Sequence, residues 1–598
     1  MGRSISAFMG IPYAQPPLGK LRFQRPVPIS RKGGVFDARQ ARPGCLQLDL
    51  KYSEVVDIDN SDTVEDCLHL NVFAPRRSDS AEDYEDEAPK QDVKLPVFVF
   101  LYGGVYVWGE NQLALYDGVE FAAEADAIYV VVNYRLNIFG FLKSPDDRIP
   151  GNVGLWDQLE ALKWVRENIA SFGGDPEMVT LGGQSAGAFS AAIHTYSPLS
   201  RGLFKRAFLM SGSSFSLKFL QRTSTDDLFG TVANTLSCLD GVDPVDCLTT
   251  RNLTRNSLKS IENELRTRFM NLVPSSVDQL MDHPVDELHR NKYHIKEVML
   301  GITLREGDFF INNFGRRLPF FSDLLGQTPQ AAIRLAMKVL FGIGIRESAE
   351  IYNAYFADSA TGEFSSHELV RKVSDIVGHC VFDCPTEIFA RHAAASGVKV
   401  RHYVYAHQPS VKINLNTGNE PTHIDDIPFM LGSINSVAEN SRTLRMKLPK
   451  FFLDAQKKFS PEEHHFSRVV IRQIANFMRS GKPRIPGSDR EWPLYTKANP
   501  AIVYMAPNNF TVVKGPKSDK CSLWEPYIVS SSPDTTTSTE PQAPKTTTES
   551  IEENVIRRGK VLRRTQGRNS SDTVTAQASI LLLFCSLAYF HLAVSVRT

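Results

Sequence analysis

The chain has 598 residues, of which 42% are hydrophobic and 22% are charged, and its formal net charge at pH 7 is zero. This composition is typical of a globular protein with a large core, and the length suits an α/β domain with long insertions. Because the charge is balanced, no basic surface is indicated, and we exclude a nucleic-acid partner.

The N-terminal segment is rich in proline, glycine and arginine, so we expect residues 5 to 45 to form irregular, turn-rich structure. Residues 1 to 22 are too polar for a signal peptide. A match to the myristoylation pattern at residues 1 to 6 conflicts with the disulfides expected below. We therefore interpret the N-terminus as incomplete or misassigned.

The central part of the chain alternates apolar runs with helical patterns. The runs predicted to be strands are 68–73, 95–104, 127–133, 179–181, 204–210, 297–302 and 398–405. Residues 158–169 and 462–479 have the spacing of helices, and Gly481 is expected to cap the second. Together these patterns predict a doubly wound α/β sheet of mainly parallel strands that are buried on both faces. An acidic insertion at residues 76–94 is expected to form a solvated surface loop.

One short motif within this pattern suggests chemistry. Gly183-Gln-Ser-Ala-Gly187 matches the G-x-S-x-G nucleophile elbow, with a strand predicted before it and small residues suited to a helix after it. A sharp strand-to-helix turn strains the backbone at Ser185 and leaves no room for side chains two residues away on either side. The pentapeptide alone is a weak signal, but its context predicts a serine nucleophile at the positive end of a helix, where a developing oxyanion is stabilised.

The cysteine content indicates the compartment. Eight cysteines without a C-x-x-C motif are typical of disulfides in an oxidising compartment rather than of a metal site. The acceptor pattern for N-glycosylation occurs at Asn252, Asn509 and Asn569, which agrees with this interpretation although such triplets are common by chance. We therefore predict an extracellular glycoprotein at the cell surface.

The composition changes after residue 527. Residues 528–579 are predicted to form a disordered stalk rich in serine, threonine and proline, with a basic segment and with O-glycosylation left open. Small residues from Asn569, a polar spacer and the apolar tail at 580–598 follow the order of a glycolipid (GPI) anchor signal, which predicts attachment at Asn569. A membrane span is the alternative, but the apolar stretch is short for one and His591 interrupts it.

Several longer segments carry a resemblance to a known family. They lie at residues 8–14, 65–71, 133–141 and 151–158, in the family's order. Through them the chain resembles the type B carboxylesterases, also called the cholinesterase-like family, over roughly residues 5 to 525. The resemblance implies an α/β-hydrolase fold, with a central, mainly parallel, twisted sheet and helices on both faces, in a hydrolase domain of residues 1–527.

The resemblance also implies a catalytic triad. Ser185 is the expected nucleophile, Glu306 in Glu306-Gly-Asp-Phe-Phe310 the acid, and His423 in the segment 423–432 the base. His423 would take the serine proton as the hydroxyl attacks an ester carbonyl, and Glu306 would hold the imidazole. Water would then release the acid from the acyl-enzyme. This mechanism needs no metal and no cofactor.

The implied oxyanion loop departs from the family. Where the family has three glycines after a tyrosine, this chain has Gly103, Gly104 and Val105. The donors that the resemblance implies are the N–H groups of Gly104, Val105 and Ala186. Because valine is β-branched, it restricts the backbone and crowds the acyl site, so we expect the rate and the substrate range to differ from the family's.

Structural pairs are implied by the same resemblance. It predicts a structural salt bridge between Asp175 and Arg135, and it leaves Cys380 free and Cys585 in the tail. The predicted disulfides are Cys45–Cys67, Cys238–Cys247 and Cys384–Cys521.

The resemblance leaves alternative functions open. A neuroligin-like adhesion protein could use the same scaffold. Occupied triad positions favour an ester hydrolase, and almost nothing follows the apolar tail, whereas neuroligin-like proteins carry a cytoplasmic tail there.

Among enzymes, a general carboxylesterase competes with an acetylcholinesterase. The segment 46–66 contains no tryptophan to hold choline, and Gln184 stands where cholinesterases have a glutamate. We therefore expect neutral short-chain esters as substrates, and a homodimer is left open.

Overall fold

The computed structural model describes most of the chain up to residue 529. The described residues are 4–30, 33–47, 50–51, 57–76, 94–219, 225–239, 241–267, 272–275, 280, 293–313, 330, 333–334, 337, 343–357, 364–412, 418–435, 442–447 and 458–529. The predicted stalk beyond residue 529, the apolar tail with Cys585, the acceptor Asn569 and residues 77–93 of the acidic insertion lie outside them.

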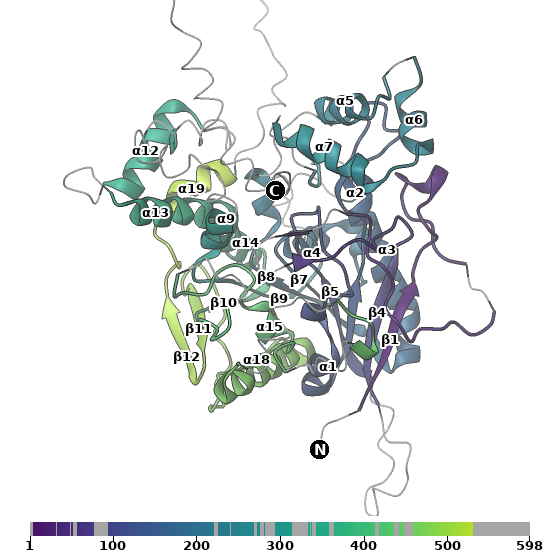
Figure 1. The fold of residues 1–598 in the computed structure, drawn as a ribbon. Coiled ribbons are helices and arrows are strands. Elements are labelled where there is room, and N and C mark those ends of the chain that lie inside the picture. The colour runs from purple at the N-terminus through teal and green to yellow at the C-terminus, as the bar shows by residue number, and fades with distance from the viewer. Residues whose placement is uncertain are drawn as a thin grey trace, which may run out of the picture.

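One ten-stranded sheet runs through the molecule in the order β1-β4-β6-β5-β7-β8-β9-β10-β11-β12 (Figure 1). Its strands are β1 Ile5–Pro12, β4 His69–Pro75, β5 Leu95–Leu101, β6 Ile128–Val132, β7 Gly174–Gln184, β8 Arg206–Met210, β9 Glu297–Thr303, β10 Lys399–Tyr405, β11 Ala501–Ala506 and β12 Asn509–Lys514. Neighbours from β6 to β11 are parallel. The pairs β1–β4, β4–β6 and β11–β12 are antiparallel. The predicted mainly parallel sheet is thus confirmed.

Helices cover both faces of this sheet, which explains why its central strands are apolar throughout. On one side α1 (Val119–Ala125) packs against α18 (Pro461–Ser480), and on the other lie α4 (Ala186–Tyr196) and α14 (Cys384–Ala395) (Figure 1). Helix α3 (Val153–Asn168) packs against β7. All residues from 97 to 101 and from 128 to 132 are buried. This arrangement is that of the predicted α/β-hydrolase fold.

Helix α18 shows how local sequence sets an element's ends. Ser460 and Glu463 form a capping box at its start, and Gly481 ends it with φ +72°. A left-handed residue at this position suits glycine because no Cβ collides with the last turn. The predicted helix at 462–479 and its glycine cap are therefore confirmed.

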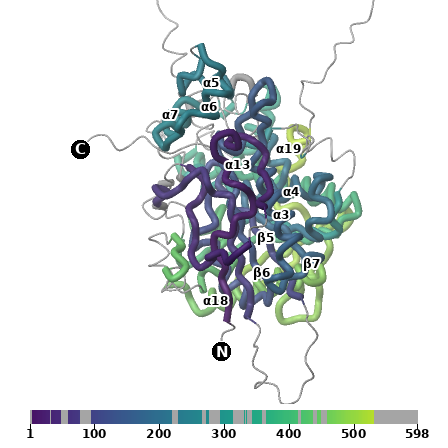
Figure 2. The backbone as a smooth tube through the Cα atoms, turned by 90° about the vertical axis from the view of Figure 1, so that its right-hand side faces the viewer, coloured from purple at the N-terminus to yellow at the C-terminus, as the bar shows by residue number. Residues whose placement is uncertain are grey.

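A smaller group of helices lies at one end of the molecule, far from α18 in both views (Figures 1 and 2). It comprises α5 (Thr225–Thr235), α6 (Pro244–Thr250) and α7 (Arg255–Thr267). Val232, Leu248 and Ile261 are buried in a hydrophobic cluster separate from the main core. The Cys238–Cys247 disulfide joins the segment after α5 to α6 within this group.

The expectation of irregular structure from residue 5 is wrong for β1. This strand pairs antiparallel with β4 at the edge of the sheet, and its register shifts between Phe8 and Ile11. Gly10, with φ +65°, lies at the shift. Edge strands tolerate glycine and proline because one side of the strand has no ladder to maintain, which hides the strand from a reading of composition.

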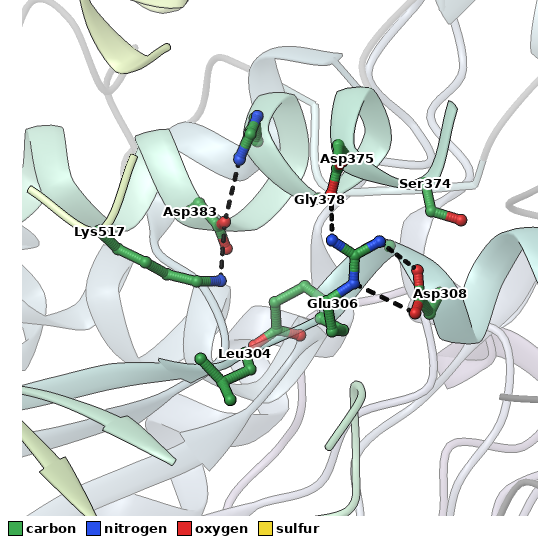
Figure 3. Close-up of a pocket in the computed structure, with 11 residues that line it drawn as sticks. Leu304, Glu306, Asp308, Ser374, Asp375, Gly378, Asp383 and Lys517 are labelled. Atoms are coloured by element: carbon green, nitrogen blue, oxygen red, sulfur yellow. Dashed lines mark hydrogen bonds and ion pairs between the residues drawn. The ribbon is translucent and has the colours of Figure 1, made fainter. Parts of the chain in front are cut away.

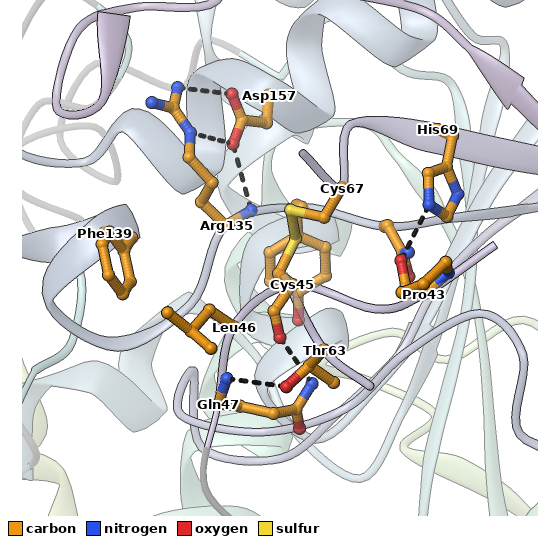
Figure 4. Close-up of a disulfide and its surroundings, with 12 residues drawn as sticks. Pro43, Cys45, Leu46, Gln47, Thr63, Cys67, His69, Arg135, Phe139 and Asp157 are labelled. Carbon is orange, nitrogen blue, oxygen red and sulfur yellow. Dashed lines mark hydrogen bonds and ion pairs between the residues drawn. A yellow bond between two sulfur atoms is a disulfide. The ribbon is translucent and has the colours of Figure 1, made fainter. Parts of the chain in front are cut away.

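The predicted salt bridge of Arg135 with Asp175 is also wrong. Arg135 instead binds Asp157 of α3, with Nη2 2.7 Å from Oδ1 and Nε 2.8 Å from Oδ2 (Figure 4). Asp175 lies at the amino end of β7 and accepts a hydrogen bond from the N–H of Glu177 in its own turn. Because Arg135 follows the carboxyl end of β6, the length of a strand separates it from Asp175.

The three predicted disulfides, Cys45–Cys67, Cys238–Cys247 and Cys384–Cys521, are present. Cys380 is free and buried. Disulfides persist in oxidising environments, which agrees with an extracellular protein. Among the described helices, none is both long and apolar enough to cross a bilayer.

Candidate active site

Ser185 lies in a strained turn between β7 and α4. Its φ is +54° and its ψ is −124°, a conformation that is rare for a residue with a side chain. A Cβ on Gly187 would overlap the carbonyl group of Leu101, and one on Gly183 would overlap the backbone of Gly187. The steric reason predicted for both glycines is confirmed, and the strand and helix stand on the expected sides of Ser185.

A buried acid–base pair lies at the carboxyl edge of the sheet. Glu306 begins α9 (Glu306–Asn313), directly after β9, and its Oε2 accepts a hydrogen bond of 2.6 Å from Nδ1 of His423. Its Oε1 accepts from the hydroxyl of Ser211 at 2.7 Å and from the N–H of Thr303 at 2.6 Å. Every acceptor oxygen of this carboxylate is therefore used.

These contacts keep Glu306 ionised. Burial by itself raises the pKa of Glu306, but the facing His423 and the hydrogen bonds from Thr303 and Ser211 outweigh burial and hold the pKa below its ordinary value. A carboxylate that only accepts hydrogen bonds makes Nδ1 of His423 the donor, which leaves Nε2 with a free lone pair when the ring is neutral.

Two further carboxyl groups follow His423 in the chain but differ in electrostatics. Burial raises the pKa of Asp425 to about 7, and burial followed by the charge of Glu306 raises that of Asp426 well above its ordinary range. Asp425 accepts one hydrogen bond, from the N–H of Thr422 at 2.9 Å. Burial disfavours the charged form of both acids, so Glu306 is the carboxylate suited to stabilise an imidazolium.

A charged cluster braces the turn that presents Glu306, beside a small polar pocket (Figure 3). Lys517 donates to the carbonyl of Thr303 and to Asp383, both at 2.9 Å. Arg305 pairs with Asp308 at 3.0 Å and also with Asp375 of α13 (Ser366–Gly378). These ion pairs lie against α13 and the π-helical turn His379–Asp383, and they hold the end of β9 in place.

The other side of the imidazole meets Gln184. Nε2 of His423 lies 3.1 Å from the amide nitrogen of Gln184, and both side chains are buried. The hydrogen bonds among the described residues do not include one from Ser185 to His423. Catalytic hydrogen bonds are often loose in unliganded enzymes. Sequence reasoning identified Gln184 as a lost charge but did not predict this contact.

The loop from Gly103 to Tyr106 lies against the elbow. A Cβ on Gly103 would meet the Gln184 side chain and, at 2.9 Å, Cβ of Ser185. Gly104, Val105 and Tyr106 follow with φ of +118°, +53° and +63°. Left-handed backbone costs a residue with a side chain about 1–2 kcal/mol, and a β-branched residue there is a true outlier. The predicted departure at Val105 is thus a site of backbone strain next to Ser185.

The loop closed by the Cys45–Cys67 disulfide contacts the chain just after Tyr106, at Gly109. Gln47 accepts a hydrogen bond from the N–H of Gly109 at 2.8 Å and donates to its carbonyl at 2.9 Å. Gln47 also donates to the carbonyl of Cys45 (Figure 4). Tyr52, the only aromatic residue in the segment 46–66, lies outside the described residues.

The two predicted N-glycosylation sites within the described residues lie at the surface. Asn252 and Asn509 are exposed, and Asn509 lies on the edge strand β12. Ala186 is the first residue of α4.

Ser211, which donates a hydrogen bond to Glu306, was not predicted from the sequence. It follows the carboxyl end of β8, and its position there could have indicated it, because α/β sheets bind ligands at that edge.

Comparison with known proteins agrees with this geometry. The profile of the carboxylesterase family matches residues 1–524. The chain is 29% identical over 560 residues to an acetylcholinesterase of Leptinotarsa decemlineata, covering 88% of this chain and 83% of the relative. It is 30% identical over 544 residues to an acetylcholinesterase of Bungarus fasciatus, covering 88% and 83%. It is 31% identical over 508 residues to the cocaine esterase of Homo sapiens, covering 82% of each. With the sheet, the elbow and the buried acid–base pair, a match of this length shows that the chain belongs to the carboxylesterase family and is a carboxylic ester hydrolase.

Proposed function

We propose that Ser185 is the nucleophile, His423 the general base and Glu306 the acid that orients it. The observation that carries this proposal is the 2.6 Å bond between Glu306 and Nδ1 of His423, formed beside a strained serine turn. Glu306 selects the tautomer in which Nε2 can accept the proton of Ser185. The N–H groups of Gly104, Val105 and Ala186 are the proposed oxyanion donors.

The reaction then runs through an acyl-enzyme. The Ser185 hydroxyl attacks the ester carbonyl and gives its proton to Nε2 of His423, which passes it to the departing alcohol. Water, activated by the same nitrogen, attacks the acyl-enzyme and releases the acid. Because Gln184 faces Nε2 at 3.1 Å, the serine hydroxyl must take the place of the Gln184 amide before the first proton transfer.

We further propose that the enzyme is a general carboxylesterase with a preference for neutral short-chain aryl or alkyl esters. A cation over an indole ring is worth up to about 2 kcal/mol when desolvated. The segment 46–66 has no tryptophan, and Gln184 brings no negative charge. The named relatives include both acetylcholinesterases and a cocaine esterase, so the residues of this chain carry the proposal.

Labelling of the serine tests the catalytic assignment. A fluorophosphonate probe should modify Ser185, located by mass spectrometry, and Ser185→Ala should lose both labelling and hydrolysis. Ser197→Ala is the matched control, because Ser197 is equally buried but follows the far end of α4. Full hydrolysis in Ser185→Ala would refute the assignment. A folded wild type that neither labels nor hydrolyses esters would favour the adhesion alternative.

A substrate pair tests the preference. Acetylthiocholine and its uncharged carbon isostere differ only in the charge of the leaving thiol. We expect the isostere to be hydrolysed with the higher kcat/KM and choline-like cations to inhibit poorly. A strong preference for acetylthiocholine would mean that another aromatic residue, such as the partly exposed Trp108, supplies the cation site.

We also propose that the protein is held at the cell surface by a glycolipid anchor at Asn569, that Asn252 and Asn509 are glycosylated, and that a stalk begins after residue 527. The exposure of Asn252 and Asn509 supports their modification. Phosphatidylinositol-specific phospholipase should release the protein from cells. Protein that stays membrane-bound and keeps residues 580–598 would instead have a membrane span. Sedimentation velocity tests the homodimer.

A further inference from the structure

Tyr106 ends the strained run in the oxyanion loop and is completely buried. Its ring meets that of Phe141 edge-on, with centroids 4.9 Å apart. Its carbonyl accepts a hydrogen bond of 2.8 Å from the N–H of Asn137. Both contacts fix the residue that directly follows Val105.

The hydroxyl of Tyr106 is the end of a buried chain of hydrogen bonds. It accepts from Oγ of Ser190 at 3.2 Å, and that oxygen accepts from the amide nitrogen of Gln158 at 3.2 Å. The amide oxygen of Gln158 accepts from Nε2 of His194 at 3.2 Å, and Nδ1 of His194 accepts from the hydroxyl of Ser200 at 2.8 Å.

All hydrogen bonds in this series have the same donor-to-acceptor direction, from Ser200 toward Tyr106. Burial, followed by the nearby His294, lowers the pKa of His194 to about 3, so the ring is neutral and has one donor and one acceptor nitrogen. With Nε2 as the donor, the three groups between Ser200 and Tyr106 each receive one hydrogen bond and give one. Satisfied buried networks of this kind hold a single arrangement of their groups.

These hydrogen bonds connect the oxyanion loop to α4 and, through α4, to α3. Ser190 and His194 are on α4, the helix that begins after Ser185, and Gln158 is on α3. A displacement of Tyr106 would therefore break its hydrogen bond with Ser190 of α4. Strained backbone persists only where its surroundings determine it in this way.

We infer that Tyr106, held by Ser190 and Gln158, is a positioning residue that keeps the N–H of Val105 aimed at the oxyanion in a loop that lacks a third glycine. This inference rests on the proposed function, because it takes Val105 to be an oxyanion donor. The N–H of Val105 would donate a hydrogen bond to the ester carbonyl oxygen as it becomes an oxyanion. Glycine would adopt the same left-handed backbone without such an anchor.

Removal of one hydroxyl tests the inference. Tyr106→Phe keeps the ring and should lower kcat about tenfold with KM within about twofold, since small misplacements in an active site cost up to about 100-fold. A trifluoromethyl ketone, whose adduct places an oxyanion in the same donors, should bind about tenfold more weakly. Tyr129→Phe is the control, because the Tyr129 hydroxyl in β6 is equally buried but has no hydrogen-bond partner in the described part of the chain.

A second background separates positioning from general damage. In Val105→Gly, the added Tyr106→Phe change should lower kcat by less than about threefold, because glycine no longer needs the anchor. Ser190→Ala should lower kcat like Tyr106→Phe, and the double variant should be no worse than either single one. Thermal unfolding of all variants verifies that they are folded.

The outcomes distinguish this inference from the proposed function. If Ser185→Ala keeps hydrolysis, the proposed function itself fails. If hydrolysis depends on Ser185 but Tyr106→Phe keeps the wild-type kcat and inhibitor affinity, only the inference is overturned. It is also overturned if Tyr106→Phe causes the same loss in both backgrounds, because that would show damage unrelated to Val105.

Discussion

Two turns face each other across the active site, and both hold residues with side chains in left-handed backbone. At the elbow Ser185 has φ +54°, and in the oxyanion loop Val105 and Tyr106 have φ of +53° and +63°. The elbow is accommodated by missing side chains, since Gly183 and Gly187 allow β7, α4 and β5 to approach so closely that a methyl group would collide. The oxyanion loop contains a β-branched residue and is held by side chains from distant helices. Positive φ is thus accommodated by missing side chains in one turn and by buried side-chain contacts in the other.

The pair of Glu306 and His423 lies outside both turns, and the loss of kcat expected when it is broken is the largest, to which the effects at the turns can be compared. We expect Glu306→Gln to lower kcat by about 10³–10⁴-fold, because the amide no longer selects the reactive tautomer or stabilises the imidazolium. Some activity should remain through the oxyanion donors. Glu420→Gln, at an exposed carboxylate in the surrounding ion pairs, is the control and should retain nearly full activity. A comparable loss in both variants would mean that the ion pairs, rather than the triad, limit the rate.

The same pair has a signature in stability. The pKa of Glu306 is lowered from the ordinary 4.5, so its ionised form stabilises the fold. The sign follows from linkage: this stabilisation is fully present above about pH 4.5 and is lost as the pH falls through the lower folded value. Urea unfolding between pH 3 and pH 6 should show a steeper decline at low pH in the wild type than in Glu306→Gln. Parallel curves would contradict a charged Glu306.

Breaking the elbow should have the next largest effect. In Gly187→Ala the new methyl group overlaps the carbonyl of Leu101, so either the helix or the strand must move. We expect kcat to fall at least about 100-fold, as for a misplacement of about 1 Å, with a loss of about 1–3 kcal/mol in the free energy of unfolding. Gly230→Ala is the control, since a Cβ there meets nothing within 4 Å. An active, stable Gly187→Ala variant would remove the steric basis of the elbow.

A charge placed between the two turns should change specificity. Gln184 touches both Gly103 and His423, so Gln184→Glu would bring a carboxylate to the point where the loops meet. We expect the ratio of kcat/KM for acetylthiocholine to that for its neutral isostere to rise about tenfold, which corresponds to about 1.4 kcal/mol. Gln24→Glu adds the same charge at an exposed position and should leave the ratio unchanged. An unchanged ratio in Gln184→Glu would show that the charged leaving group of the substrate does not lie near position 184.

Relief of strain in the oxyanion loop should have the smallest effect. We expect Val105→Gly to raise kcat about three- to tenfold, mostly for esters with longer acyl groups, because the methyl groups no longer crowd the site. Stability should change by less than about 1 kcal/mol, because relief of the left-handed strain is offset by the greater freedom of glycine in the unfolded chain. Val107→Gly, at a residue with ordinary φ in the same loop, should bring no gain in rate. An equal gain in both would show that loop flexibility rather than strain limits the rate.

The features that could be predicted from sequence are those whose cause is local or carried by a longer family resemblance. Gly183 predicts the elbow for a local reason, because a Cβ there would collide with the adjoining helix at Gly187. The collision avoided at Gly187 is with Leu101 of β5, so the motif alone marks that position. The capping box at Ser460 and the left-handed Gly481 predict the ends of α18, because both act within the helix's own first and last turns. The three disulfides and the positions of Glu306 and His423 followed from the resemblance, because their flanking residues match the family.

The remaining features depend on residues that meet only after folding. The partner of Arg135 proved to be Asp157 instead of Asp175, since strand direction decides which acid is within reach. Gln184 and His423 are 239 positions apart, and Tyr106 and Ser190 are 84 apart. A hydrogen bond is made only within about 3 Å, and no local pattern specifies such a distance between remote residues. Sequence alone therefore determined the turn of the proposed nucleophile, while tertiary packing decided what faces Nε2 of His423 and what holds the loop that contains Val105.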